Sequence, residues 1–227
     1  MYQSPYAAID KKGKPLNKQF VIVSVAVFIL LSGMLPSTSA SQCYTRDVLP
    51  RSEEALSGNA ISKFETDWNG DGIRDKVLLV KNASCVQLAV FYYDRNSKIV
   101  SHEISGDLGT GEYGGYPTQI TMDKNIIVLK TGEMRNEVVL RFRYSGKAKQ
   151  TMLIGEEVEY YTSGRSGPSR VSINYLNKQK YIYTSVFDEK EQQFKYRSGP
   201  KKKGIKRGPR PLSEINTDSM YDDAGNE

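Results

Sequence analysis

Residues 67–75, DWNGDGIRD, carry oxygen-bearing side chains at alternate positions around two glycines. Calcium is a hard cation that takes about six to eight oxygen ligands, and a tight loop supplies them when alternate side chains turn inward. The stretch matches the opening D-x-[DN]-x-[DN]-G of a calcium-binding loop, in which the glycine allows a sharp turn. We therefore predict a Ca2+ site whose ligands are Asp67, Asn69, Asp71, the backbone carbonyl of Ile73, and Asp75.

The end of this stretch departs from the helix–loop–helix calcium pattern. The twelfth position is Leu78 instead of a glutamate, and we expect a strand to follow it. Loops of this strand–loop–strand kind occur in FG-GAP propeller blades, and water or another part of the chain would complete the ligand shell. Because Asn-Gly and Asp-Gly pairs are also good turn formers, a polar turn without metal is the alternative.

Little in the sequence points to catalysis. His102 is the only histidine, so a zinc site built from several histidines and a Ser-His-Asp arrangement both lack their residues. There is no P-loop, and no pair of carboxylates stands out for two-carboxylate hydrolysis. We therefore expect a binding protein and not an enzyme.

The elements that must position these residues are strands. From about residue 60, runs rich in β-branched and aromatic residues alternate with Gly, Asn, Asp and Ser clusters, which is the pattern of strands and turns. In VVLRFRY, residues 138–144, arginines alternate with apolar and aromatic residues, which predicts one buried and one wet face. We predict an all-β fold of antiparallel sheets over residues 41–198, as a sandwich or in a propeller-like arrangement, with one short helix at 52–59.

The N-terminal residues have the order of a secretory signal. Lysines precede an apolar run at residues 20–31, and the small residues STSA, ending at Ala40, suit signal-peptidase cleavage. We predict that residues 1–40 are a signal peptide, so that the mature chain is periplasmic and makes no stable membrane insertion. The alternative is an uncleaved N-terminal helix that anchors the chain, although the apolar stretch is shorter than the roughly 20 residues of a spanning helix.

Cys43 and Cys85 are the two cysteines of the chain, and both follow the predicted signal peptide. An even number of cysteines in an oxidising compartment favours a disulfide, so we predict that these two pair. Two unpaired thiols are the alternative.

The chain carries a net charge of +6, and much of its basic charge lies in one run, RSGPKKKGIKRGPRP, at residues 197–211. Nucleic-acid binding would require basic residues interleaved with stacking aromatics on a folded face, and this run has no aromatic residue. We therefore expect no nucleic-acid partner. The polar, Gly/Pro-rich composition predicts that residues 199–227 form a charged, largely disordered tail.

Several stretches together resemble a family of small exported bacterial β proteins. The stretches are DWNGDGIRDKVLLV, CVQLAVFYYDRNSKIV, LRFRYSGKAKQTMLIGEEVEYYTS and SINYLNKQKYI, and the resemblance covers roughly residues 60–185. The family includes periplasmic inhibitors of invertebrate-type lysozyme and immunity proteins against lysozyme-like effectors of a bacterium-killing type IV secretion system. The resemblance implies a β-rich fold with a bound calcium ion and a protruding loop that enters the cleft of a lysozyme. In the inhibitors, that loop carries a Ser-Gly-x-x-Tyr or similar motif.

The nearest match to this inhibitory loop is GDLGTGEYGGY, residues 106–116. There Thr110, Gly111 and Tyr113 provide a hydroxyl, a flexible turn and an aromatic donor, which could hydrogen-bond the catalytic carboxylates of a muramidase. Glu112 departs from the pattern, because a further carboxylate would be repelled. YYTSGRSGPS, residues 160–169, is a competing loop in which Arg165 offers a cation to the cleft.

These observations lead to one expected function and one main alternative. A third class, a cell-wall or polysaccharide enzyme, would need a convergent carboxylate pair in a cleft. We expect an exported periplasmic binding protein that inhibits a lysozyme-like peptidoglycan hydrolase, as an inhibitor or immunity protein, and that calcium stabilises. The alternative is a calcium-binding, FG-GAP-like adhesion or scaffold module without inhibitory activity. That module would be favoured by further copies of the acidic loop, and this sequence has one copy.

Overall fold

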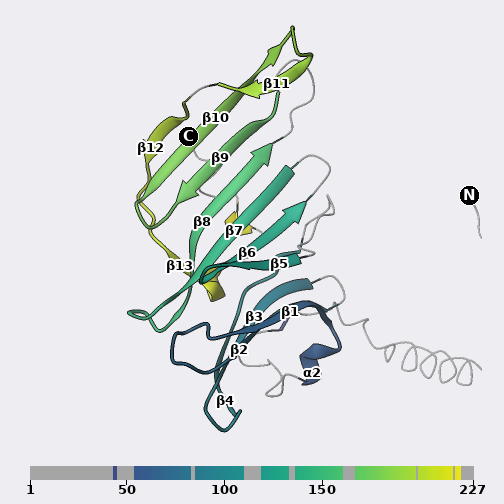
Figure 1. The fold of residues 1–227 in the computed structure, drawn as a ribbon, viewed down its shortest axis with the longest axis vertical. Helices are drawn as coiled ribbons and strands as arrows, with labels where there is room; N and C mark the ends of the chain where they lie inside the picture. The colour runs from purple at the N-terminus through teal and green to yellow at the C-terminus, as the bar shows by residue number, and fades with distance from the viewer. Residues whose placement is uncertain are drawn as a thin grey trace, which may run out of the picture. The chain divides into compact units, whose positions relative to one another are not determined.

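Two antiparallel sheets make up the fold (Figure 1). The structure is a computed structural model, and its strands form where β-branched and aromatic residues recur between polar turns. The all-β prediction is therefore confirmed. The residues that the structure describes are 43–44, 54–82, 85–109, 119–132, 136–160, 167–197, 199–216 and 218–220.

The smaller sheet is a meander with the strand order β1-β2-β3-β4. Its strands are β1 (Ala60–Thr66), β2 (Asp75–Asn82), β3 (Cys85–Tyr93) and β4 (Ile99–Ile104). Every residue of β3 is buried, so both faces of this sheet are covered. On the face turned away from the larger sheet, Leu56 of the single-turn helix α2 (Glu54–Ser57) packs against Leu78 and Phe91. A short helix was expected at 52–59.

The larger sheet has the strand order β11-β10-β9-β8-β7-β6-β5, with β12 paired to β10 and β13 paired to β8. Its strands are β5 (Gln119–Asp123), β6 (Ile126–Gly132), β7 (Asn136–Ser145), β8 (Gln150–Tyr160), β9 (Ser169–Asn174), β10 (Gln179–Asp188), β11 (Gln193–Tyr196), β12 (Lys201–Gly204) and β13 (Arg210–Pro211). Each pairing between neighbours is antiparallel.

The main core lies between the inner faces of the two sheets. Val77 and Leu88 of the smaller sheet belong to the same buried cluster as Leu140 and Phe142 of the larger one. Burying each such side chain stabilises the fold by roughly 1.5–3 kcal/mol. The sheets therefore pack as a sandwich, which is one of the two arrangements that the sequence predicted.

The C-terminal region differs from the largely disordered tail predicted for residues 199–227. β12 and β13 join the larger sheet, and the 3-10 turns η1 (Leu212–Glu214) and η2 (Asp218–Met220) follow. Leu212 and Ile215 are fully buried in the main core. The polar, Gly/Pro-rich composition of this region predicts disorder, and these two isolated apolar residues are what anchor it to the core. Residues 221–227 lie outside the described residues.

Cys43 and Cys85 form a disulfide, as predicted. A disulfide indicates an oxidising, extracytoplasmic location. The predicted signal peptide, residues 1–40, lies outside the described residues. Within the described part of the chain, no helix is long and apolar enough to cross a membrane.

Candidate functional site

The acidic loop, residues 67–75, joins β1 to β2 and turns at two glycines. Gly70 and Gly72 have φ angles of +79° and +86°, left-handed values that residues with a side chain rarely adopt. Both N–H groups donate to the carboxylate of Asp67, Gly70 to Oδ1 and Gly72 to Oδ2, each at 2.9 Å. The two glycines thus fold the loop around its first carboxylate.

The middle side chains of the acidic loop also accept hydrogen bonds from the loop backbone. Asn69 Oδ1 accepts the N–H of Asp71 at 2.9 Å, and Asp71 Oδ1 accepts the N–H of Ile73 at 2.8 Å. Asn69 Nδ2 also donates to Asp71 Oδ2 at 2.8 Å. Each oxygen has more than one lone pair, so these bonds leave capacity for a cation.

Asp75, the last predicted ligand of the loop, is fully buried at the start of β2. Its Oδ2 accepts the N–H groups of Trp68 at 3.1 Å and Asn69 at 3.2 Å, and its Oδ1 accepts that of Tyr93 at 3.2 Å. Burial raises the pKa of Asp75 above its usual range, and the three amide bonds oppose that rise. This carboxylate ties both ends of the loop to β3.

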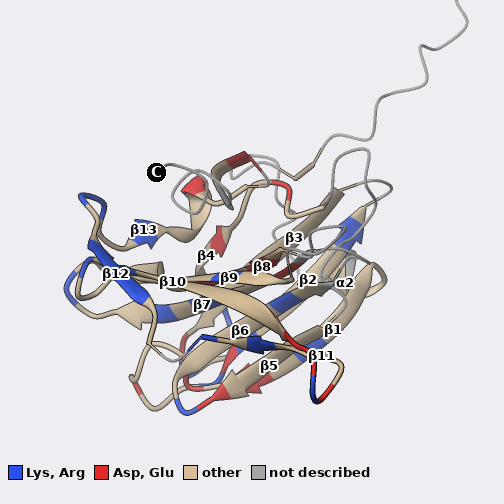
Figure 2. Ribbon diagram, turned by 90° about the horizontal axis from the view of Figure 1, so that it is seen from above, with Lys and Arg blue, Asp and Glu red and all other residues tan. Residues whose placement is uncertain are grey.

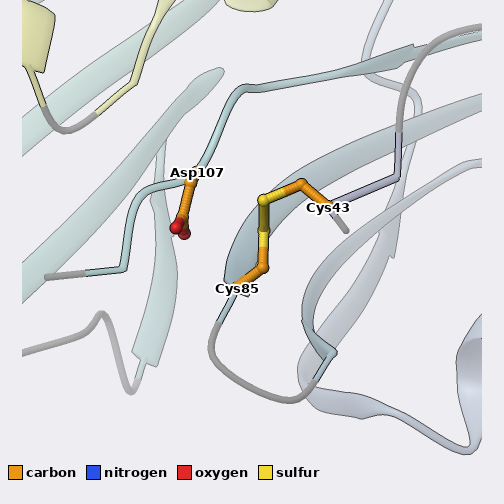
Figure 3. A group of neighbouring side chains, drawn as sticks. All are labelled: Cys43, Cys85 and Asp107. Carbon is orange, nitrogen blue, oxygen red and sulfur yellow. A yellow bond between two sulfur atoms is a disulfide. The ribbon is translucent and has the colours of Figure 1, made fainter. Parts of the chain in front are cut away.

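The donor chemistry of the acidic loop fits calcium, because every predicted side-chain ligand offers oxygen. The loop carboxylates do not converge on one point. Within the described ranges, the group of His, Cys, Asp or Glu ligand atoms that lie within 4.8 Å of one another is Cys43, Cys85 and Asp107 (Figure 3). Because its two sulfurs are bonded to each other, that group is not a metal site. Asp75 turns instead toward backbone amides, which explains why the loop does not gather its carboxylates.

Trp68, the second residue of the acidic loop, connects the loop to both sheets. Its Nε1 donates to Thr151 Oγ1 of β8 at 3.0 Å, and that hydroxyl lies 2.9 Å from the Tyr92 hydroxyl of β3. Tyr92 also donates to Glu103 of β4, and burial followed by the Glu103 charge raises the pKa of Tyr92. Glu103 Oε2 in turn accepts the N–H of Thr151 at 2.8 Å. We call these four residues the sheet-junction network.

The sheet-junction network was not predicted from the sequence. One signal was present, since Trp68 is the only tryptophan of the chain and stands inside the acidic stretch. Its partners come from β3, β4 and β8, and no local pattern relates those positions.

A second buried polar group, the strap cluster, consists of Glu156, Tyr175 and Arg210. The Tyr175 hydroxyl donates to Glu156 Oε2 at 2.9 Å, and Arg210 Nη2 lies 3.8 Å from the same oxygen. Arg210 Nη2 also donates to the Tyr175 hydroxyl at 3.3 Å and to the Ser219 carbonyl at 3.2 Å. The cluster fixes residues 205–216, which we call the C-terminal strap, to β8.

The base of the first candidate contact loop lies against the disulfide-bearing strand. Asp107 Oδ1 accepts the N–H of Val86 at 3.0 Å and that of Gly109 at 2.8 Å. Leu108 is buried and donates its N–H to the Val86 carbonyl at 2.7 Å. The predicted contact residues Thr110, Gly111 and Tyr113 follow directly but lie outside the described residues.

The base of the second candidate loop lies against the β10–β11 hairpin. A Cβ atom at Gly167 would stand 2.1 Å from Phe194 Cδ1 and 2.3 Å from Ser185 Oγ, so a larger residue there would require these side chains to move. Phe194 stacks edge-to-face with Phe187 at 5.2 Å between ring centroids, and both rings are exposed. Arg165, the predicted cation of this loop, lies outside the described residues.

The strand pairings assign the acidic loop and the candidate contact loops to opposite ends of the larger sheet. β8 ends and β9 begins at one end, where Tyr160 pairs with Ser169. Trp68 of the acidic loop contacts Thr151 near the other end of β8. A cation in the acidic loop would therefore act on the contact loops through the sheets and not by direct contact.

Comparisons with protein-family models, curated proteins and solved structures give no match to this chain. The geometry itself defines the class: a disulfide-linked, two-sheet antiparallel β sandwich with an acidic loop at one end.

Proposed function

We propose that this chain is an exported binding protein that inhibits a lysozyme-like peptidoglycan hydrolase. The observation that supports the proposal is the fixed base of each candidate contact loop. Asp107 and Leu108 hold the first base against β3 beside the disulfide (Figure 3), and at the second base the backbone of Gly167 packs closely beside Phe194 and Ser185. A loop on a rigid base loses less conformational entropy when it binds, which favours tight association.

The chemistry of the two loops suits the catalytic cleft of such a hydrolase. Glycoside hydrolases use a pair of carboxyl groups, and hydrogen bonds to charged carboxylates are stronger than those between neutral groups. In this proposal Thr110 and Tyr113 donate hydroxyl groups to those carboxylates, and Gly111 allows the turn between them. Arg165 on the second loop adds a cation at the rim.

Calcium in the acidic loop forms the second part of the proposal. Asp67, Asn69 and Asp71 would supply side-chain oxygens together with the Ile73 carbonyl and Asp75. A cation there would offset the cost of burying the Asp75 carboxylate, which is the main cause of its raised pKa. Its effect on inhibition would be indirect, because the loop lies at the other end of the sheet.

The location proposed for this activity is the periplasm, reached through cleavage of residues 1–40. The disulfide supports an oxidising compartment. N-terminal sequencing of the exported form should then begin at or near Ser41. Recovery of intact residues 1–40 in a membrane fraction would favour the anchored alternative.

The test is inhibition of a panel of lysozymes, measured as clearing of a peptidoglycan suspension. At least one enzyme should be inhibited, and Tyr113→Phe should weaken inhibition by roughly 10- to 100-fold, because it removes a hydrogen bond to a charged group. Tyr181→Phe is the matched control, since the Tyr181 hydroxyl bonds only to Gln179 of its own strand among the contacts described. Equal inhibition by both variants would assign the contact elsewhere, and Arg165→Ala then tests the second loop.

The second candidate function is a calcium-stabilised adhesion or scaffold module. The observation that favours it is the remoteness of the acidic loop from both candidate contact loops, since calcium could then stabilise the fold without serving inhibition. Calcium-dependent stability with no inhibition of any lysozyme in the panel would support this module.

A further inference from the structure

Six cations gather where the edge of the larger sheet meets the turn between β9 and β10. They are Lys178, Lys201, Lys202, Lys203, Lys206 and Arg207, which we call the basic edge. All of them are exposed except Lys203, which is half-buried. Figure 2 shows Lys and Arg concentrated along β12 and the adjoining loops, with no Asp or Glu among them. The basic edge is thus a one-signed patch on a chain whose charges are otherwise mixed.

Backbone pairing fixes the positions of these cations. Residues 201–204 pair with residues 179–182 of β10, and the N–H of Ile205 donates to the Lys178 carbonyl at 2.9 Å. Successive residues of a strand point to opposite faces, so the three lysines of β12 project on both sides of the edge. The run that composition alone assigned to a disordered tail therefore has a defined arrangement.

Most of the basic edge has no counter-charge within the fold. Lys201, Lys202, Lys203 and Lys206 form no ion pair with any residue that the structure describes. The stability of the fold does not account for this concentration of charge, which indicates an external anionic partner.

An apolar surface adjoins the basic edge. Leu176, in the turn that carries Lys178, is 49% exposed. With Pro209 and Met152 it lines an open groove of about 410 Å3. Ser145 and Gly146 of the neighbouring β7–β8 turn also line this groove, and Lys147, the next residue of that turn, is exposed. An exposed leucine rimmed by cations is the arrangement of proteins that bind membrane surfaces through both charge and apolar contact.

We propose that the basic edge docks on an anionic phospholipid bilayer, with Leu176 entering the interface between headgroups and acyl chains. Lysines are flexible point charges that suit a diffuse negative surface better than one bidentate partner. A soluble polyanion would gain nothing from Leu176, and a single-stranded nucleic acid would stack its bases on aromatic residues, which the basic edge does not contain. The docking is peripheral, and it is independent of the inhibition proposed above.

The test measures co-sedimentation of the full-length chain with vesicles of phosphatidylcholine, alone or mixed with phosphatidylglycerol. The test variant is Lys201→Gln/Lys202→Gln/Lys206→Gln. The matched control removes three exposed lysines elsewhere, Lys63→Gln/Lys98→Gln/Lys190→Gln, so both variants keep the same net charge and the same N-terminal residues. Thermal melting confirms that both are folded.

We expect the anionic vesicles to bind the control and wild-type chains alike. The test variant should bind about 100-fold more weakly, on an estimate of roughly fivefold per cation. The difference should disappear at high salt, because salt screens exposed charges. Leu176→Ser should weaken binding about 10-fold, and this effect should persist at high salt.

Three results would overturn the proposal. One is equal vesicle binding by the test and control variants. Another is that the wild-type chain binds equally well to vesicles with and without phosphatidylglycerol, and that the test variant binds both as strongly as the wild-type chain does. The third is that duplex DNA or lipid-free polyphosphate displaces the chain from the vesicles when the phosphate concentration of the competitor is lower than that of the bilayer. That result would assign the basic edge to a soluble polyanion.

Discussion

The sheet-junction network and the strap cluster are both buried polar groups, but they hold different parts of the chain by different means. The first links Trp68 of the acidic loop to β3, β4 and β8 mainly through hydroxyl, indole and amide donors. The second holds the C-terminal strap through Glu156 and Arg210, an ion pair with a fully buried carboxylate.

The difference predicts unequal costs of damage. Removing one member of a buried ion pair leaves an uncompensated charge, whereas removing a neutral donor or acceptor leaves one unsatisfied hydrogen bond. A substitution in the strap cluster should therefore destabilise the fold more than one in the sheet-junction network. The sequence pattern, by contrast, singles out only the acidic loop, which carries Trp68 of that network.

The largest effect is expected in the strap cluster. Arg210→Met should lower the free energy of unfolding by about 3–5 kcal/mol, because it removes the guanidinium that lies 3.8 Å from the fully buried Glu156 carboxylate. Urea denaturation measures this loss. The double variant Arg210→Met/Glu156→Gln should recover part of it, and exposed Arg143→Met should change little. A double variant as unstable as Arg210→Met alone would show that the charge of Glu156 is not the cause.

The next effect concerns calcium in the acidic loop. If calcium binds the folded chain only, it should stabilise the fold by about 2.7 kcal/mol at one hundred times its Kd. Melting curves with calcium and with chelator measure this, and magnesium should substitute poorly because it prefers a smaller octahedral site. Asp71→Ala should erase the difference, while exposed Asp123→Ala should keep it. Identical curves for metal-free and calcium-treated wild-type chain would reduce the stretch to a polar turn.

A smaller effect is expected in the sheet-junction network. Thr151→Val removes the acceptor of Trp68 Nε1 and a hydrogen-bond partner of Tyr92 at nearly constant volume. The expected loss is about 1–3 kcal/mol in urea denaturation. The control is Thr121→Val on an exposed position of β5. A loss as large as that of Arg210→Met would remove the distinction between the two clusters.

The smallest loss of stability is expected at Gly106, which lies against the C-terminal end of the strap. The Gly106 N–H donates to the Ile215 carbonyl at 2.8 Å, and a Cβ at Gly106 would lie 2.8 Å from Asn216 Cβ. Gly106→Ala should therefore shift the strap and cost about 1 kcal/mol. Gly146→Ala is the control, because its Cβ would meet nothing within 4 Å. A similar thermal stability for both variants would show that the strap yields freely at this point.

Local patterns account for what could be predicted from the sequence. The strands follow from β-branched and aromatic runs between turn residues, and the acidic loop follows from oxygen side chains spaced around Gly70 and Gly72. The disulfide between Cys43 and Cys85 follows from an even cysteine count and a predicted export signal.

What could not be predicted depends on residues that are distant in sequence. β13 consists of Arg210 and Pro211 alone and pairs with β8 at Leu153 and Met152. A two-residue strand has no periodicity to detect, and a charged arginine gives no sign of burial until Glu156 and Tyr175 are known to be its neighbours. The predicted hydrolase contacts, Thr110, Gly111, Tyr113 and Arg165, stay predictions.

The C-terminal strap also has a consequence for the order in which the chain folds. Leu212 and Ile215 complete a core whose other buried residues lie between Trp68 and Tyr175, and they are synthesised after all of those residues. A nascent chain that lacks the strap therefore keeps apolar side chains of both sheets exposed, and such surfaces promote aggregation. Premature termination before residue 210 should leave a chain that has all the strands of its smaller sheet but no closed core.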